Sequence, residues 1–475
     1  MEGDGVTRLR ATGTFAALAV VGLTIAGCAN GSLRHTANHE SCAVGPQASE
    51  TPPTTIGCAP PPPERLMTSS GSDAFSSVGN APEILAAEAR SSAAGEEVNK
   101  ALAGKLPSVG LLATAGGGTE INDVDEGRRT GGTYSYALGL DIPLYQGGRA
   151  DAAISAARAD HRASAEAAKD RRVATAYELA LALARISQQR EAIAILDRQQ
   201  RTLHRLAGEV KAEIKGGATS RVDVDDVNRQ LAHIAVAREE VQLAVTDAEY
   251  TTRRLGISAD AKLPDTAGLG LPDTEQELVA LAMRENPRVK ERMARVEGAE
   301  ARVTQAKGEM LPTVSAGVRL TGEQGLLADV DDSHQGVAEV RFSLPIYTGG
   351  SRSATIRQRA DEKLSALLER DAAVEGVVAA VRSAIDRRNK ARRMLTLAEV
   401  EKRSAATMLE GLRAERKVGE RSTFDEIRAI ENFANAELNL TQARYQLRAA
   451  DYTLAAETGQ MDRLVSSMPV AEPVK

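Results

Sequence analysis

The side chains that could do chemistry are few and scattered. The chain has 6 His and 3 Cys, and one close group is His35, His39 and Cys42. It stands among Asn, Ser, Thr and Pro residues, which are typical of an extended tether rather than of a metal site. The sequence contains no Gly-x-x-x-x-Gly-Lys-Ser phosphate loop, no paired His ligands and no Gly-x-Ser-x-Gly. We therefore predict no enzymatic activity, no cofactor and no metal.

The N-terminal segment gives one cysteine a defined chemical context. Two arginines, an apolar run over 14–25 and the phrase Ala-Gly-Cys28 follow one another. This order is typical of a secretory signal, and the run is too short to cross a bilayer as a helix. A Cys after Ala-Gly resembles a bacterial lipobox. We predict a lipoprotein signal peptide over 1–27 and lipidation at Cys28; an ordinary signal followed by a chance Cys is the alternative.

Residues 28–79 are predicted to be a Pro-rich, lipidated linker, with an unbroken run of Pro at 60–63. Cys42 and Cys58 lie in this linker. They could form a disulfide in an oxidising compartment, and the sequence leaves open whether they pair.

The overall composition favours long helices over a large globular core. Aromatic residues make up 3% of the chain, Trp is absent, and charged residues make up 26%. Such usage resembles that of coiled coils. The formal net charge is -6, so the chain lacks the basic excess of nucleic-acid-binding proteins, and we predict no nucleic-acid partner.

One phrase occurs twice in the chain. Pro, an aliphatic residue, Tyr, a polar residue and Gly-Gly occupy 143–148 and again 345–350, and a Leu-Pro-x-Val phrase begins at 106 and again at 311. Two phrases that recur with nearly the same offset indicate an internal duplication. We predict two repeats, 80–273 and 274–462, and a C-terminal tail over 463–475.

Each repeat is predicted to hold one β-hairpin. Apolar and polar residues alternate in 133–142, 313–321 and 337–346, and less cleanly in 107–116. Tilted strands of about ten residues can cross a bilayer, so an apolar face towards lipid and a polar face towards water fit a transmembrane barrel. A soluble, half-buried sheet is the alternative. The charged residues of the polar face are Asp141, Arg319, Glu339 and Arg341.

Each Gly-Gly is followed by a long predicted helix, over roughly 150–214 and 351–416. At about 1.5 Å per residue, each would be close to 100 Å long, and apolar residues spaced three and four apart indicate a coiled-coil seam. Each helix ends at a glycine and a second helix follows at once, which predicts two antiparallel helical hairpins. Ser220 with Asp223 would begin the second helix of the first hairpin, and a capping box of Thr423 and Glu426 that of the second.

Four strands cannot close into a barrel. An open edge in lipid would leave backbone N–H and C=O groups unpaired, so several protomers must share one barrel. Two protomers would give eight strands with an interior filled by side chains, and three would give twelve strands with room for water.

Residues 80–460 resemble the TolC family of outer membrane factors. The resemblance rests on the two repeats, the Leu-Pro-x-Val strand openings, the Pro-aliphatic-aromatic-x-Gly-Gly strand ends, and tip phrases of the form Val-Gly-x-x-x-x-x-Asp. It implies a fold that is mainly α with β: a homotrimer with one twelve-stranded barrel, four strands per protomer, continued by a long α-helical coiled-coil tunnel. The protein would lie in the bacterial outer membrane, lipid-anchored and barrel-inserted, and extend into the periplasm.

The resemblance implies a passive duct that is opened at its periplasmic tip by an adaptor or pump. The protein would be the outer membrane channel of a tripartite efflux pump or of a type I secretion system. Its partners would be two further copies, a periplasmic adaptor (membrane fusion) protein, an inner-membrane transporter and outer membrane lipid. The alternative is a non-channel periplasmic coiled-coil envelope or adaptor protein. The sequence does not name the exported substrate.

The resemblance also implies a gate at the helix tips. In the family, a tip Asp of the first repeat and a tip Arg of the second are linked, and alignment by the shared Gly puts Asp223 and Arg421 at these places. Asp425 would add an acidic ring at the mouth. Arg416 and Arg428 replace a Tyr and an acidic residue of the family's pattern, which leaves the details of the latch and the ion selectivity open. Alternatively, the two Asp only favour the dipoles of their helices and Arg421 is a solvated turn residue.

Each repeated phrase is predicted to form the swivel from a barrel strand to a tunnel helix. The prolines would end the hydrogen-bonded ladder, the glycines would adopt unusual backbone angles, and the tyrosines would anchor at the membrane–water boundary. A plain strand-to-helix loop would use the same residues. The two swivels comprise Pro143, Tyr145, Gly147, Gly148, Pro345, Tyr347, Gly349 and Gly350.

Overall fold

The chain divides into two units, residues 1–67 and 68–475. The computed structural model describes residues 81–461 apart from 123–126, 216–220, 262, 264–265, 267–268 and 326–332. All described residues belong to the second unit. The predicted signal peptide, the linker with its three cysteines, Ser220 and the C-terminal tail lie outside the described residues and stay predictions.

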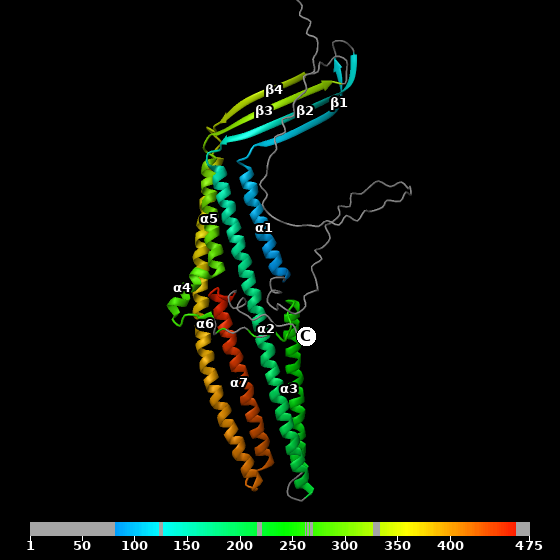
Figure 1. Cartoon of the computed structure of the whole chain (residues 1–475), viewed down its shortest axis with the longest axis vertical. Coiled ribbons are helices and arrows are strands. Elements are labelled where there is room, and N and C mark those ends of the chain that lie inside the picture. Colours follow the sequence, from blue (N-terminus) through cyan, green and yellow to red (C-terminus); the bar gives the residue numbers. More distant parts are fainter. Residues whose placement is uncertain are drawn as a thin grey trace, which may run out of the picture. The chain divides into compact units, whose positions relative to one another are not determined.

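The described elements follow the same order twice (Figure 1). Each repeat has a helix, a β-hairpin, a 67-residue helix and a shorter antiparallel helix, and the long helices end within one residue of the predicted bounds. The second repeat also has a short helix, α4 (Glu275–Glu285), ahead of this series. The first repeat comprises α1 (Pro82–Ala103), β1 (Ser108–Asn122), β2 (Gly127–Tyr145), α2 (Arg149–Lys215) and α3 (Arg221–Arg254). The second comprises α4 (Glu275–Glu285), α5 (Pro287–Gly308), β3 (Thr313–Gly325), β4 (Ser333–Ser343), α6 (Ser351–Lys417) and α7 (Thr423–Glu457).

The two hairpins join into one antiparallel sheet with the order β1-β2-β3-β4. The pairing register aligns the two sequence patterns, so that cross-strand rows such as Val109, Leu140, Val318 and Ala338 are apolar. Because side chains alternate between faces, the neighbouring row, Ser108, Asp141, Gly317 and Glu339, belongs to the other face. The predicted two-faced sheet is confirmed. Every residue of β4, one of the two edge strands, is exposed in the protomer.

Pro143 does not end the hydrogen-bonded ladder, so that part of the swivel prediction is wrong. Strand β2 continues through a register shift between Pro143 and Tyr145, and both residues pair with β3. The reason is that β1 pairs with β2 only as far as Asp141. Beyond that point one edge of β2 needs no partner, so a residue without an N–H can be accommodated beside a bulge. Pro345, by contrast, follows the end of β4 at Ser343.

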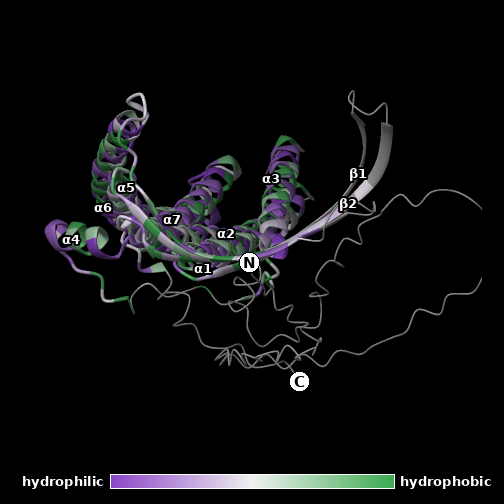
Figure 2. Cartoon of the chain, turned by 90° about the horizontal axis from the view of Figure 1, so that it is seen from above, coloured by the Kyte–Doolittle hydropathy of each residue, from purple (hydrophilic) through white to green (hydrophobic). Residues whose placement is uncertain are grey.

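Helix α2 is the centre of the helical part. Its N-terminal part packs against α1 and α5 and the rest of it against α3 and α7, whereas α6 packs against α4, α5 and α7. Small residues such as Ala176, Ala180 and Ala184 are fully buried where α7 packs along α2, which permits a close approach of the two backbones. Hydrophilic and hydrophobic residues are interleaved along the helices, as Figure 2 shows. None of the described helices is both long and apolar enough to cross a membrane.

The largest apolar cluster lies towards the turns of the two helical hairpins. It combines residues from α2, α3, α6 and α7 and therefore joins the two repeats. Its fully buried members include Leu203 and Val210 of α2, Val227 of α3, and Ile427 and Ile430 of α7. This cluster is the base on which the polar groups of the helix tips are held.

Candidate functional site: helix tips and strand-to-helix junctions

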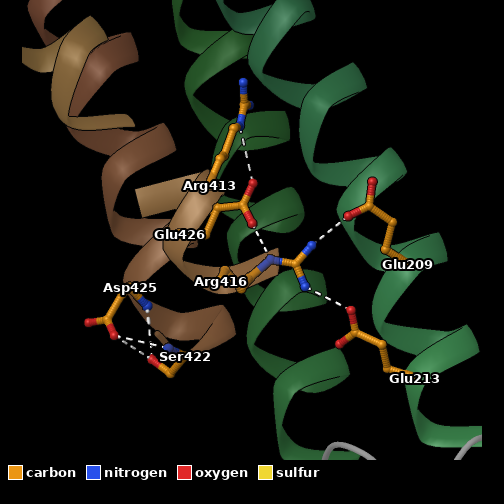
Figure 3. A network of polar contacts seen from close by, with 7 residues as sticks. All are labelled: Glu209, Glu213, Arg413, Arg416, Ser422, Asp425 and Glu426. Carbon is orange, nitrogen blue, oxygen red and sulfur yellow. Dashed lines mark hydrogen bonds and ion pairs between the residues drawn. The ribbon is translucent and has the colours of Figure 1, made fainter. Parts of the chain in front are cut away.

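Arg416 is the centre of an ion network at the tips (Figure 3). Its side chain lies near the end of α6 and is only 8% exposed. From α6 it reaches α2, where its two terminal nitrogens donate to Glu209 at 2.5 Å and to Glu213 at 2.9 Å. Its Nε donates to Glu426 of α7. One guanidinium therefore binds three carboxylates on two other helices.

Glu426 is the second buried member of this network. Its side chain is also 8% exposed, and its carboxylate accepts from Arg416 and, at 3.1 Å, from Nε of Arg413. Burial disfavours the charged form of Arg416, but attraction to Glu426 and hydrogen bonds to Glu213 and Glu426 outweigh this and raise the pKa of Arg416. The guanidinium is thus held charged although its side chain is largely buried.

This ion network links the two repeats. Glu209 and Glu213 belong to the first repeat, and Arg413, Arg416 and Glu426 belong to the second. A buried ion pair adds little net stability over an apolar contact, but the loss of one partner leaves an uncompensated charge and costs about 3–5 kcal/mol. The arrangement therefore acts as a clamp that resists separation of the two hairpins.

Asp425 and Ser422 form a capping box at the start of α7. Asp425 N–H donates to Ser422 Oγ at 3.2 Å, and Ser422 N–H donates to the Asp425 carboxylate at 3.2 Å. The predicted box of Thr423 and Glu426 is wrong by one residue, because the extended residue before the helix is Ser422 and Glu426 is turned inward to Arg416. Hydrogen bonds from the side chain and backbone of Ser422 lower the pKa of Asp425.

The two residues of the predicted Asp–Arg link lie at the turns of different hairpins. Asp223 is in the first turn of α3. Arg421 lies in the turn between α6 and α7, and its Nε donates to Glu415 of its own hairpin at 2.8 Å. This contact raises the pKa of Arg421. The structure therefore gives Arg421 a partner within the protomer that the sequence interpretation missed.

Glycine conformation at the two junctions agrees with the predicted swivels. Gly147, Gly148, Gly349 and Gly350 all have φ between 62° and 81°, a region that other residues rarely adopt. Their surroundings differ. A Cβ on Gly147 would lie 2.6 Å from the backbone oxygen of Gly308, whereas a Cβ on Gly349 would have no neighbour within 4 Å in the protomer. The first junction is packed against the end of α5.

The predicted anchor residues of the two junctions are on the surface of the protomer. Tyr145 is half exposed and Tyr347 almost fully exposed, together with its neighbour Ile346. Exposed aromatic and aliphatic side chains at the base of a two-faced sheet are compatible with a membrane boundary.

Taken together, the fold and the site define a duplicated protomer in which an open, two-faced sheet continues into long helical hairpins. The sequence profile of the outer membrane efflux protein family matches residues 76–255 and 278–460. The chain belongs to this family. The predicted resemblance to the TolC family, the channel fold of the protomer and the outer-membrane efflux role are confirmed at the level of the family, which is one of efflux channels and not of enzymes.

Individual relatives agree with this assignment. The outer membrane efflux protein BepC of Brucella suis is 26% identical over 350 residues, which cover 72% of this chain and 75% of BepC. The outer membrane protein TolC of Vibrio cholerae is 23% identical over 80% of this chain and 89% of that protein. The solved structure of the open state of the MtrE outer membrane channel of Neisseria gonorrhoeae shares the fold, with a TM-score of 0.68, 15% identity, and coverage of 81% and 88% of the two chains.

Proposed function

We propose that three copies of this chain form a passive duct through the outer membrane. Their sheets would close into one twelve-stranded barrel, and their helices would continue as a tunnel into the periplasm. The duct would serve a tripartite efflux pump or a type I secretion system and receive cargo through a periplasmic adaptor protein from an inner-membrane transporter.

The observation that carries this proposal is the sheet. It has four strands, an apolar face, a charged face and two edge strands, β1 and β4. In lipid, every backbone N–H and C=O needs a partner, so β4 of one copy must pair with β1 of the next. Two copies would give a barrel of eight strands, whose interior is filled by side chains. Three copies give twelve strands, which is the smallest barrel of this kind that leaves room for water.

The helix tips are proposed to form the periplasmic gate. Asp223 and Arg421 would make a charge-assisted link that holds the mouth shut, and Asp425 would line the mouth with negative charge. The exposed pair of Arg421 with Glu415 supports this role, because a solvated ion pair is weak and Arg421 can exchange partners. The Arg416 network would keep the two hairpins of one protomer together while the mouth opens.

Two further elements of the proposal concern attachment to the membrane. The glycine swivels would turn each strand into its tunnel helix, with Tyr145 and Tyr347 at the lipid boundary. Lipidation of Cys28 would anchor the N-terminus in the same membrane.

Extraction of native membranes tests this function against the envelope coiled coil or adaptor. A barrel trimer should stay in the outer-membrane fraction in high salt and at alkaline pH, and detergent should release it with the mass of three protomers. Release by salt alone, as a monomer, would contradict the proposed function.

A further inference from the structure

The internal duplication allows each contact in one repeat to be compared with the equivalent position in the other. Gly147 corresponds to Gly349, an offset of 202 residues, and the same offset relates Asp223 to Asp425. In the second repeat, Tyr452 of α7 is only 1% exposed. It lies in an apolar packing site on α2 that is formed by Val173, Ala176, Tyr177, Ala180, Leu181 and Ala184.

The equivalent tyrosine in the first repeat is not buried in such a packing site within the protomer. Tyr250 of α3 is 62% exposed. Val236 and Leu243 are equally exposed and precede it at intervals of seven residues, so the three side chains form one stripe along α3. Their counterparts in α7, Leu438, Tyr445 and Tyr452, are all packed against apolar clusters.

Helix α6 has an open groove at the place that corresponds to the packing site of Tyr452 on α2. The residues of α6 that correspond to the six α2 residues, at an offset of 202, all line this groove together with Val374. They are Glu375, Val378, Ala379, Arg382, Ser383 and Asp386. The same helix exposes large apolar residues where α2 buries them: Leu397 is 63% exposed and its counterpart Ile195 only 2%.

From this correspondence we infer that α3 of one copy packs along α6 of the next copy and that Tyr250 is seated in the α6 groove. The occupant is a second copy of this chain, because α3 carries the side chain and the spacing that fill the equivalent site on α2. The inference rests on the proposed trimer and adds the residues that fix the register between neighbouring copies.

The two tyrosine sites differ in chemistry. Val173, Ala180 and Ala184 are replaced in α6 by Glu375, Arg382 and Asp386. Arg382 already binds Glu275 of α4 at 2.8 Å. The groove on α6 therefore offers charged partners to the tyrosine hydroxyl, and the seam between copies is more polar than the seam inside one copy. A polar seam weakens with salt and water entry more readily than a dry apolar one.

Site-specific photo-crosslinking in the intact outer membrane tests this inference. Benzoylphenylalanine in place of Tyr250 should give covalent dimers and trimers on irradiation, with the crosslinked peptide in residues 374–386. The matched control is the same substitution at Tyr452, which should crosslink only within one protomer. A reciprocal probe in place of Val378 should capture the Tyr250 segment, so the result does not depend on one variant folding.

The failure of the inference can be distinguished from the failure of the proposed function. One outcome is a protein with the mass of three protomers in which the probe at Tyr250 crosslinks outside residues 374–386, crosslinks to another protein, or gives no crosslink. In each of these cases the proposed packing of Tyr250 is wrong, but the proposed channel is not contradicted. If the full-length protein is monomeric in detergent, both are wrong.

Discussion

At the scale of single residues, Arg416 is a largely buried cation that joins three helices. The sequence interpretation treated it only as an expected departure from the family's pattern. The structure gives it three carboxylate partners and little contact with solvent. A signal was present in the sequence: Glu209 and Glu213 are four apart, and Arg413 and Arg416 three apart, so each pair shares a helix face.

Replacing Arg416 with Ala should loosen the helix tips. Glu426 would stay buried with Arg413 as its remaining partner, so the cost should lie below the value of about 3–5 kcal/mol for a wholly uncompensated buried charge. Hydrogen exchange of the first turns of α7 and of the last turns of α2 should therefore become faster. The control is Arg428→Ala. Arg428 is exposed, and its guanidinium carbon lies 4.4 Å from the centroid of the Phe424 ring, so its loss should change hydrogen exchange little. Equal effects of the two variants would contradict the clamp.

The capping box gives the start of α7 a defined pH dependence. Because hydrogen bonds from Ser422 lower the pKa of Asp425, folding favours the ionised carboxylate. The stabilisation is complete above the ordinary Asp pKa of about 4 and is lost as the pH falls through the lower, folded value. The protection of amides in the first turn of α7, taken relative to the intrinsic exchange rate at each pH, should fall below about pH 4 in the wild type. In Asp425→Asn this acid-induced loss of protection should be smaller, and an unchanged pH profile would contradict the assignment.

At the scale of elements, the long helices, the hairpins and the two faces of the sheet were predictable. Their signals are periodic and repeated, so single exceptions do not obscure them. Local junctions were less predictable. Pro143 remains in a ladder because β1 begins only at Ser108, opposite Asp141. Ser422 rather than Thr423 caps α7 because the backbone is extended at that residue. Neither property can be read from residue type alone, since one depends on where a neighbouring strand begins and the other on where the helix begins.

The two glycine junctions offer a matched comparison. Gly147→Ala and Gly349→Ala both place a Cβ at a φ of 62°, which costs roughly 1–2 kcal/mol of strain in each. Only Gly147→Ala adds a clash with the backbone of Gly308. We expect a larger loss of folded protein in the outer membrane for Gly147→Ala, measured as the fraction of heat-modifiable oligomer on gels. If the two variants lose equal amounts, the close packing against α5 does not matter.

At the scale of the whole molecule, the proposed trimer has two unequal kinds of seam between helical hairpins. Inside one protomer, a shared apolar cluster and the Arg416 network join the hairpins. Between protomers, the proposed seam has a more polar groove and an exposed Arg421 that already has a partner in its own hairpin. The mouth should therefore open between protomers, with each pair of hairpins moving as one body.

The central claim is a closed duct whose mouth is held by the tips, and conductance across a planar bilayer tests it most directly. Wild-type protein purified in detergent should give small, stable currents. Arg421→Ala, alone or with Asp223→Ala, should give larger resting currents. Currents that are unchanged in the Arg421 variants would contradict the gate, and the absence of current from folded, trimeric wild-type and variant protein would contradict the duct itself.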